Sequence, residues 1–152
     1  MDVEATLTCP SNASAMYAVV SDLGRYPEWL DIVPAAVRVD ADDRDPGPAW
    51  SVDLRGQLGP LRRTKRLRMV RTAADAPRTV RFERRELDGR SHAPWVMTAA
   101  VRDDGADGEV TLAMTLHYGG TLWVPALDRV LADEIRRGRS RLAALVETSA
   151  GT

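Results

Sequence analysis

The sequence predicts one α+β domain, residues 1–152, in which an antiparallel sheet of about six or seven strands packs against a long C-terminal helix. Two patterns indicate this fold class. Short segments of alternating apolar and polar residues, separated by turn residues, fill most of the chain up to Tyr118. The last segment has apolar residues at helical spacing, and a lone helix with one apolar face buries that face on a sheet. The length suits a single core.

The N-terminal region is predicted to form a strand followed by two short helices. Apolar and polar residues alternate over residues 3–9, as in a strand with one buried face. A side-chain oxygen of Ser11 or Asn12 can cap a helix over residues 13–21, because it can accept hydrogen bonds from the free amides of the first turn. The pattern then breaks, and a second short helix is expected to reach Ile32.

The central region is predicted to be a meander of strands joined by tight turns. Proline, glycine and aspartate residues mark the turns, and Asp88-Gly89 is typical of a compact hairpin. The predicted strands cover residues 37–39, 50–54, 62–72, 79–87, 95–101 and 110–118. The long helix follows, with Pro125 suited to its first turn and an apolar stripe that runs from Leu127 to Val146. Gly138 lies inside this helix, either to leave room for a ligand or a close backbone contact, or without a structural reason.

The charges are balanced overall but unevenly distributed along the chain. There are 21 basic and 22 acidic residues, for a net charge of −1, which argues against a uniformly basic nucleic-acid-binding protein. Residues 55–90 contain 12 basic and four acidic side chains and carry +8, so the remainder carries −9. Lys65 is the only lysine, and all other basic residues are arginines. The positive charge is therefore concentrated on the central strands.

The cysteine and histidine contents bear on the compartment and on cofactors. Cys9 is the only cysteine, which excludes an intramolecular disulfide and favours a reducing compartment. No apolar run is long enough to span a bilayer, and the acidic N-terminus lacks the features of a secretory signal, so we predict a cytoplasmic protein. His92 and His117 form no cluster with metal-ligand spacing, and no phosphate-binding loop or serine-hydrolase elbow occurs. Neither a metal nor another cofactor is predicted.

Three local sequences and the order of the elements resemble a known superfamily. The sequences are Cys9–Ala13 before the first helix, Ser21–Trp29 after it, and Leu116–Trp123 before the last helix. Together with the strand, two short helices, meander and long final helix, they resemble the helix-grip fold of the SRPBCC superfamily, over residues 3–146. This superfamily includes START lipid-transfer domains, birch-pollen-allergen-like proteins and bacterial polyketide cyclases and dehydrases.

The resemblance implies a curved sheet wrapped around the long helix, with a cavity between them that holds an apolar small molecule. It also implies that the segment Tyr26–Trp29 borders the cavity entrance. Members range from carriers to cyclases, so the resemblance leaves the activity open. The strand segments 62–71 and 78–85 are richer in arginine than a lipid carrier requires.

Period-two alternation predicts which strand residues face the cavity. If the large apolar residues point inward, the cavity is mainly apolar, as small-molecule sites usually are. Trp29 and Trp50 could stack on a ring-shaped ligand, although tryptophans are also ordinary core residues. The predicted ligand-binding residues are Trp29, Trp50, Leu54, Leu67, Met69, Phe82, Trp95, Met97, Met114 and Ile135.

The same alternation brings four polar side chains, Lys65, Arg84, Glu86 and Tyr118, to the cavity face. These are the candidate catalytic residues. Arg84 or Lys65 would bind a carbonyl, enolate or carboxylate of the ligand, while Glu86 or Tyr118 would move a proton. The alternative is that Arg84 and Glu86 pair at the cavity rim, because buried charge is costly and long side chains reach solvent easily.

The opposite face of the sheet is predicted to carry outward arginines. These are Arg62, Arg66, Arg68, Arg81 and Arg85. Such a patch would attract an acyl carrier protein, an anionic membrane surface or RNA. The alternative is a solvated face that Glu83 and neighbouring carboxylates partly neutralise, and no aromatic residues interleave there to stack bases.

The leading functional hypothesis is the binding of a hydrophobic, ring-containing or polyketide-like molecule, with cyclisation, aromatisation or dehydration as a further step. In that step the cavity would hold the reactive carbons together. The alternative is a non-catalytic carrier of a lipid or quinone. The predicted partners are a hydrophobic small molecule and an acyl carrier protein, without nucleic acid, and the protein is expected to be a monomer or homodimer.

Overall fold

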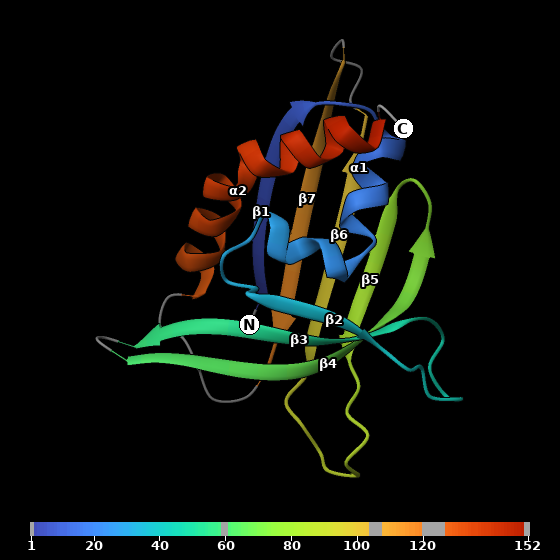
Figure 1. The fold of residues 1–152 in the computed structure, drawn as a ribbon, viewed down its shortest axis with the longest axis vertical. Coiled ribbons are helices and arrows are strands. Elements are labelled where there is room, and N and C mark those ends of the chain that lie inside the picture. Colours follow the sequence, from blue (N-terminus) through green and yellow to red (C-terminus); the bar gives the residue numbers. More distant parts are fainter. Residues whose placement is uncertain (1, 59–60, 104–107, 120–126, 151–152) are drawn as a thin grey trace.

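The computed structural model describes residues 2–58, 61–103, 108–119 and 127–150. A seven-stranded antiparallel sheet forms one layer, and the helices lie together on one of its faces (Figure 1). The elements are β1 (Asp2–Pro10), α1 (Ala13–Val20), the 3-10 helix η1 (Leu23–Glu28), β2 (Ala35–Val39), β3 (Ala49–Leu58), β4 (Leu61–Asp75), β5 (Thr79–Arg84), β6 (Trp95–Arg102), β7 (Glu109–Tyr118) and α2 (Leu127–Ala150). The predicted α+β class, short helices and long final helix are confirmed. Pro125 and the end of the Leu116–Trp123 sequence lie outside the described residues.

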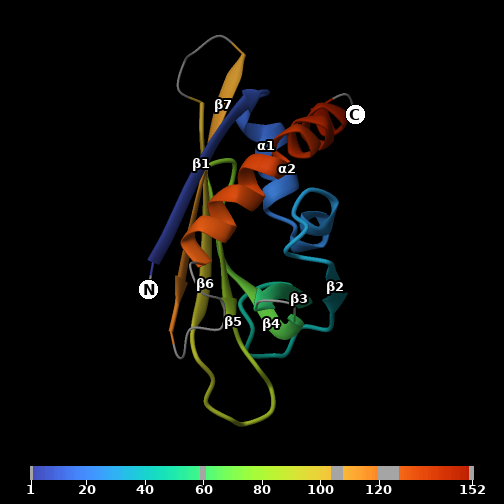
Figure 2. The same cartoon turned by 90° about the vertical axis from the view of Figure 1, so that its left-hand side faces the viewer.

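The first strand of the chain lies beside the last one in the sheet. The strand order is β1-β7-β6-β5-β4-β3-β2, so β2 to β7 form a meander and β1 adds to its far edge. Figure 2 shows that β1, β7, β6 and β5 stand nearly in one plane, whereas β4, β3 and β2 bend away toward the side of the helices. The sheet is therefore curved, and its concave face holds α1, η1 and α2 (Figure 2).

Polar side chains start both short helices. Asn12 precedes α1, and its Oδ1 accepts a hydrogen bond from the amide of Ala15 at 2.9 Å. Asn12 is thus the cap, and not Ser11, the other residue considered. Asp22 caps η1 in a similar way, since its Oδ1 accepts from the amide of Gly24 at 2.9 Å. Each cap satisfies a first-turn amide that the helix itself cannot pair.

The second short helix ends earlier than predicted. It stops at Glu28 and does not reach Ile32. The reason is that the following residues turn toward β3, where the carbonyl of Ile32 accepts a hydrogen bond from the amide of Arg55 at 2.8 Å. The segment between η1 and β2 therefore lies against the sheet as irregular chain.

The compact hairpin predicted at Asp88-Gly89 is wrong. β5 ends at Arg84, and β6 begins only at Trp95, so a longer connection separates the two strands. Pro94 has no amide hydrogen to donate to a neighbouring strand, so paired structure starts at the next residue. Gly89 still turns the chain, with a φ of 71° that favours glycine.

Aromatic rings form the centre of the core on the concave side of the sheet. Tyr26, Trp29, Trp50 and Phe82 are each at most 2% exposed. The rings of Tyr26 and Trp29 have centroids 5.5 Å apart, and Trp50 packs edge-on against Phe82 at 5.6 Å. Such tilted and edge-on contacts are favoured by the charge distribution of aromatic rings.

Helix α2 packs closely on Trp29 because Gly138 has no side chain. A Cβ atom at position 138 would lie 2.2 Å from the carbonyl oxygen of Trp29 and 3.1 Å from Cε3 of its ring. Glycine in a helix costs about 1 kcal/mol relative to alanine. The close backbone contact accounts for this cost and gives Gly138 a structural reason.

We expect Gly138→Ala to destabilise the fold by about 2 kcal/mol, since the added methyl group must displace the backbone at Trp29. Urea unfolding followed by circular dichroism measures the change. Ser140→Ala on the same helix is the control, because Ser140 is exposed and its substitution should alter stability by less than about 0.5 kcal/mol. A Gly138→Ala protein as stable as the wild type would contradict the close contact.

Candidate functional site

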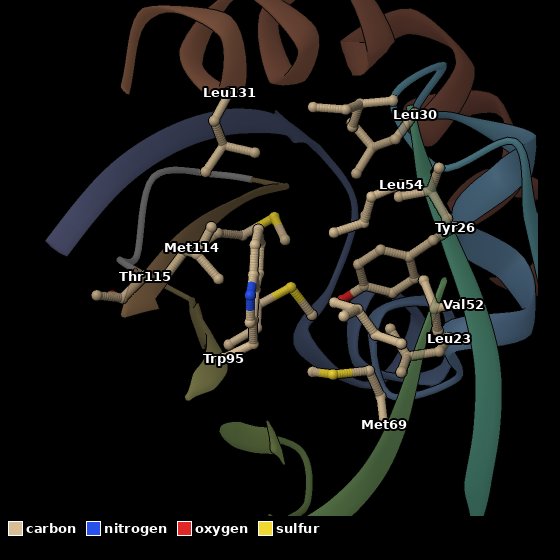
Figure 3. A pocket seen from close by; sticks show the side chains of 15 residues that line it. Leu23, Tyr26, Leu30, Val52, Leu54, Met69, Trp95, Met114, Thr115 and Leu131 are labelled. Carbon is tan, nitrogen blue, oxygen red and sulfur yellow. The ribbon is translucent and has the colours of Figure 1, made fainter. Parts of the chain in front are cut away.

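A cavity of about 80 Å³ lies between the concave face of the sheet and the segment around η1. Strands β3, β4, β6 and β7 form one side, while η1, the residues after it and one leucine of α2 close the other (Figure 3). The lining residues are Leu23, Tyr26, Leu30, Ile32, Val33, Val52, Leu54, Leu67, Met69, Trp95, Met97, Met114, Thr115, Leu116 and Leu131. The resemblance implies a cavity between the sheet and the long C-terminal helix, but Leu131 is the one described lining residue from α2, and η1 with the residues after it forms most of that wall.

The described lining offers mainly hydrocarbon and sulfur to a ligand. Of the lining residues, Trp95 carries an indole N–H, and only Tyr26 and Thr115 carry hydroxyl groups. The Tyr26 hydroxyl donates to the carbonyl of Val20 at 2.8 Å, and burial raises the pKa of this phenol far above its usual value. The exposed Thr115 side chain points away from the others in Figure 3. The cavity therefore suits an apolar molecule.

Flexible side chains line a cavity that is small for a ligand site. Its volume of about 80 Å³ lies below the roughly 300 to 1,000 Å³ of typical small-molecule pockets. Met69, Met97 and Met114 belong to the lining. Methionine is unbranched and adapts its shape at low cost. Rearrangement of these side chains would let a larger ligand enter.

The wall opposite the sheet is held by a buried carboxylate on α2. Leu30, Ile32 and Val33, in the segment after η1, line the cavity. Glu134 is 8% exposed, and its Oε2 accepts a hydrogen bond from the amide of Ile32 at 3.1 Å. Its Oε1 accepts from Arg137 at 2.9 Å. Because both oxygens are bonded, this carboxylate can remain buried and fix the wall to α2.

A second contact joins the same wall to α2. Asp31 accepts from Arg141 Nη1 at 2.9 Å, and both side chains are substantially exposed. The hydrogen bond and charge of Arg141 lower the pKa of the Asp31 carboxyl below its usual value. Exposed ion pairs contribute little to stability, so the buried contact of Glu134 is the stronger one.

Six of the predicted ligand-binding residues line the cavity. They are Leu54, Leu67, Met69, Trp95, Met97 and Met114. The other four, Trp29, Trp50, Phe82 and Ile135, are buried in the core and are not among its lining residues. Trp50 and Phe82 pack against each other, and Trp29 packs against Gly138. Protein contacts thus occupy these rings.

The charged residues predicted to face the cavity lie together beside it, although none is among its described lining residues. Arg84 Nε donates to Glu86 Oε2 at 2.9 Å, with the two side chains 9% and 18% exposed. Arg84 Nη1 also donates to the carbonyl of Ala93 at 3.4 Å. A Glu86 oxygen accepts from the backbone amide of Arg68 at 3.3 Å. This pairing corresponds to the alternative considered from the sequence.

Lys65 and Tyr118 both contact the cavity residue Trp95. The Lys65 Nζ atom is 5.8 Å from the centroid of the Trp95 ring, within the range of a cation–π contact. The Tyr118 ring stacks on Trp95 with centroids 5.6 Å apart. Burial lowers the pKa of the Lys65 ammonium, as does the charge of Arg84, and Glu86 acts in the opposite direction.

Carboxylates pair with several of the predicted outward arginines. Ion pairs join Arg66 to Asp53, Arg81 to Glu83 and Arg68 to Asp45. Arg68, predicted to face outward into the cationic patch, is covered there, because its guanidinium donates to the backbone carbonyl of Asp40 and to the carboxylate of Asp45, between β2 and β3, and its side chain is only 12% exposed. The Arg62 side chain lies outside the described residues. The partly neutralised face agrees with the alternative of a solvated surface.

The segment after η1 is a wall of the cavity that the sequence patterns did not predict. Residues 29–33 have neither strand nor helix periodicity, and their place depends on hydrogen bonds to Arg55 and Glu134, which are distant in sequence. The available signal was their composition, Trp-Leu-Asp-Ile-Val, shortly after Pro27. Four apolar residues in five are unusual for an exposed connection.

The curved sheet, with the long helix and the apolar cavity on its concave face, is the helix-grip fold found in START-like structures. The model of the family described as polyketide cyclase/dehydrase and lipid transport matches residues 1–147. The chain belongs to this family. No curated protein sequence matches the chain.

Solved structures share the fold at low sequence identity. A START superfamily protein from Mycobacterium smegmatis is 15% identical with a TM-score of 0.70, covering 97% of each chain. A protein from Thermus thermophilus is 14% identical with a TM-score of 0.68, covering 98% of this chain and 99% of that one. A protein from Deinococcus radiodurans is 16% identical with a TM-score of 0.66 over the whole of both chains. These likenesses establish the fold.

The described residues contain neither a membrane-spanning helix nor a cluster of metal-ligating side chains. None of the helices there combines the length and the hydropathy needed to cross a bilayer. Nor do three or more histidine, cysteine, aspartate or glutamate side chains within those ranges gather where they could hold a metal ion.

We expect Glu134→Ala to destabilise the protein by about 2 kcal/mol, because the buried amide of Ile32 loses its acceptor. Hydrogen exchange of that amide should accelerate in parallel. Glu134→Gln is the matched variant, since its amide oxygen can still accept this bond and should preserve most of the protection. Equal exchange rates for Ile32 in the alanine variant and the wild type would refute the role of Glu134.

Proposed function

We propose that this protein binds a hydrophobic, ring-containing or polyketide-like small molecule in the cavity between the sheet and the helices. The observation that carries the proposal is the apolar lining described above, in which the rings of Tyr26 and Trp95 lie on opposite sides of the cavity (Figure 3). Flat aromatic surfaces favour ring-shaped ligands through stacking and edge contacts. The family's description, which includes both cyclases and lipid transport, agrees with such a ligand.

Two roles are compatible with this binding. A carrier for a lipid or quinone needs only an apolar cavity and a wall that can open. The described lining supports this role, because its hydroxyl groups are engaged or point elsewhere. An enzyme additionally needs polar groups that reach the ligand, and the charged residues beside Trp95 bear on this second role.

Filling the cavity should abolish binding without unfolding the protein. Leu131 of α2 lines the cavity and is half-buried, so Leu131→Trp would place an indole where the ligand lies. We expect the affinity for the neutral apolar dye N-phenyl-1-naphthylamine, followed by its fluorescence, to fall at least about tenfold, or about 1.4 kcal/mol.

Leu145→Trp is the matched control, because Leu145 lies on the same helix, is also half-buried and is not among the lining residues. Its affinity for the dye should stay within about twofold of the wild type. Equal affinities of the Leu131→Trp and Leu145→Trp proteins would reject this cavity as the binding site. Circular dichroism and urea unfolding show whether each variant is folded.

The second candidate function is cyclisation, aromatisation or dehydration of a polyketide-like substrate. It is favoured by the half-buried group of Lys65, Arg84 and Glu86 beside a cavity residue. Arg84 or Lys65 would polarise a ketone, the Glu86 carboxylate would take the proton from the attacking carbon, and the Tyr118 hydroxyl would give a proton to the oxygen of the attacked ketone. The cavity would hold the two reacting carbons together, which supplies much of the rate. Delivery of the substrate by an acyl carrier protein belongs to this candidate.

The catalytic role predicts a separation between turnover and binding. Arg84→Ala and Tyr118→Phe should each lower turnover of a linear poly-β-ketone thioester about 100-fold, while dye binding changes by less than about threefold. Chromatography of the products measures turnover, and dye fluorescence measures binding. Unchanged conversion in both variants would refute these residues as catalytic, and absence of conversion by the wild type would favour the carrier.

A further inference from the structure

We propose that the ligand is an amphipathic organic acid, whose apolar part occupies the cavity and whose carboxylate is bound by the ammonium group of Lys65. This inference rests on the proposed function, because it names the chemical class of the ligand for the same cavity. It assigns the recognition of the ligand's polar end to one side chain, whichever of the two roles the protein performs.

The position of Lys65 places its charge next to the cavity. Lys65 is paired directly opposite Leu54 of β3, and paired residues present their side chains on the same face of a sheet. Leu67, two residues further along β4, shares that face as well. The Nζ atom lies 5.8 Å from the centroid of Trp95. Leu54, Leu67 and Trp95 all line the cavity, so the ammonium lies at its edge.

The neighbouring charges leave the ammonium available. Arg84 is the other cation whose charge acts on Lys65, and Glu86 binds that arginine at 2.9 Å. Glu86 also accepts a hydrogen bond from the backbone amide of Arg68, and this bond helps to fix the position of the Glu86 carboxylate. In the described part of the chain, no carboxylate lies within ion-pair distance of Lys65. The group of Lys65, Arg84 and Glu86 therefore carries one net positive charge beside an apolar cavity.

Half-burial makes this cation receptive to an anion. Burial and the charge of Arg84 lower the pKa of the Lys65 ammonium, while Glu86 compensates only in part. A carboxylate that contacts Nζ would stabilise the charged form and raise its pKa. A neutral ligand that covers the same group would leave this pKa unchanged or lower it further.

The number and surroundings of the charges favour a carboxylate. One uncompensated ammonium matches a singly charged group, whereas a phosphate ester carries up to two charges and is usually bound by several cations or amides. The cavity residues next to Lys65 are Leu54, Leu67 and Trp95, which surround it with apolar groups. The anionic group must therefore be attached directly to an apolar skeleton.

A matched pair of ligands tests the proposal. We expect the wild type to bind 2-naphthylacetate at least about tenfold more tightly than 2-(2-naphthyl)ethanol, as measured by calorimetry, since a hydrogen bond to a charged group contributes at least that factor. Lys65→Met retains the approximate length of the side chain and removes its charge, so the preference for the acid should disappear. Lys65→Arg, which restores a positive charge, should recover part of it.

Arg66→Met is the control for the loss of a cation from β4. Arg66 is the next residue, points to the opposite face and pairs there with Asp53 at 2.8 Å. This variant should keep the wild-type preference for the acid. If it loses the preference as Lys65→Met does, the effect arises from overall charge and the proposal is overturned.

Because Lys65 is the only lysine, the pKa of its ammonium group can be measured directly. Reductive methylation with ¹³C-formaldehyde labels Lys65 and the N-terminal amine, and titration by NMR gives the pKa of each. Saturating 2-naphthylacetate should raise the pKa of Lys65, whereas the alcohol should not. A rise of the N-terminal pKa alone would overturn the assignment.

The outcomes distinguish this inference from the function on which it rests. If acid and alcohol bind the wild type with equal affinity, and the Lys65 pKa does not rise with the acid, the inference fails while the apolar cavity keeps its role. If neither naphthyl compound nor the neutral dye binds, the proposed function fails, and the inference fails with it.

Discussion

The cavity depends on the way helix α2 docks on the irregular segment after η1. Gly138 brings the two backbones into contact at Trp29, and Glu134 supplies the acceptor for the buried amide of Ile32. Together these contacts hold the segment above the concave sheet at a fixed distance. Without them the apolar residues of the segment would collapse onto the strands, because burying the remaining surface is favourable. The empty space is thus a consequence of backbone packing between a helix and a connection.

The site combines an apolar cavity with a group of charged side chains beside it. Along β4, Leu67 and Met69 line the cavity, whereas Lys65 on the same face lies at its edge. Arg84 is paired opposite Met69, and its guanidinium binds Glu86. Charges inside the cavity would be costly, and at its end they keep partial contact with solvent. This arrangement would orient a bound ligand, since the apolar part of the ligand and its polar end would contact different residues.

The sequence predicted the parts of the fold that depend on local periodicity, and it failed where distant contacts decide. Alternation located the strands and the cavity-facing leucines and methionines. It placed Trp50 and Phe82 on the correct face, but alternation does not say which inward residues meet the cavity and which meet each other. Arg68 shows the same limit on the other face, because Asp45, which lies on the loop between β2 and β3, covers it. The wall at residues 29–33 has no period at all and is set by tertiary hydrogen bonds.

The methionines in the lining let the cavity change its shape while its surface stays apolar. Met69, Met97 and Met114 come from three different strands, so the space can widen on several sides without moving the backbone. A rigid pocket selects ligands by their shape. This cavity would instead bind ligands with an affinity that depends on where their polar groups lie. Ligands with different carbon skeletons would then compete for the same cavity. During evolution the protein could change from one class of ligand to another while the fold stays the same.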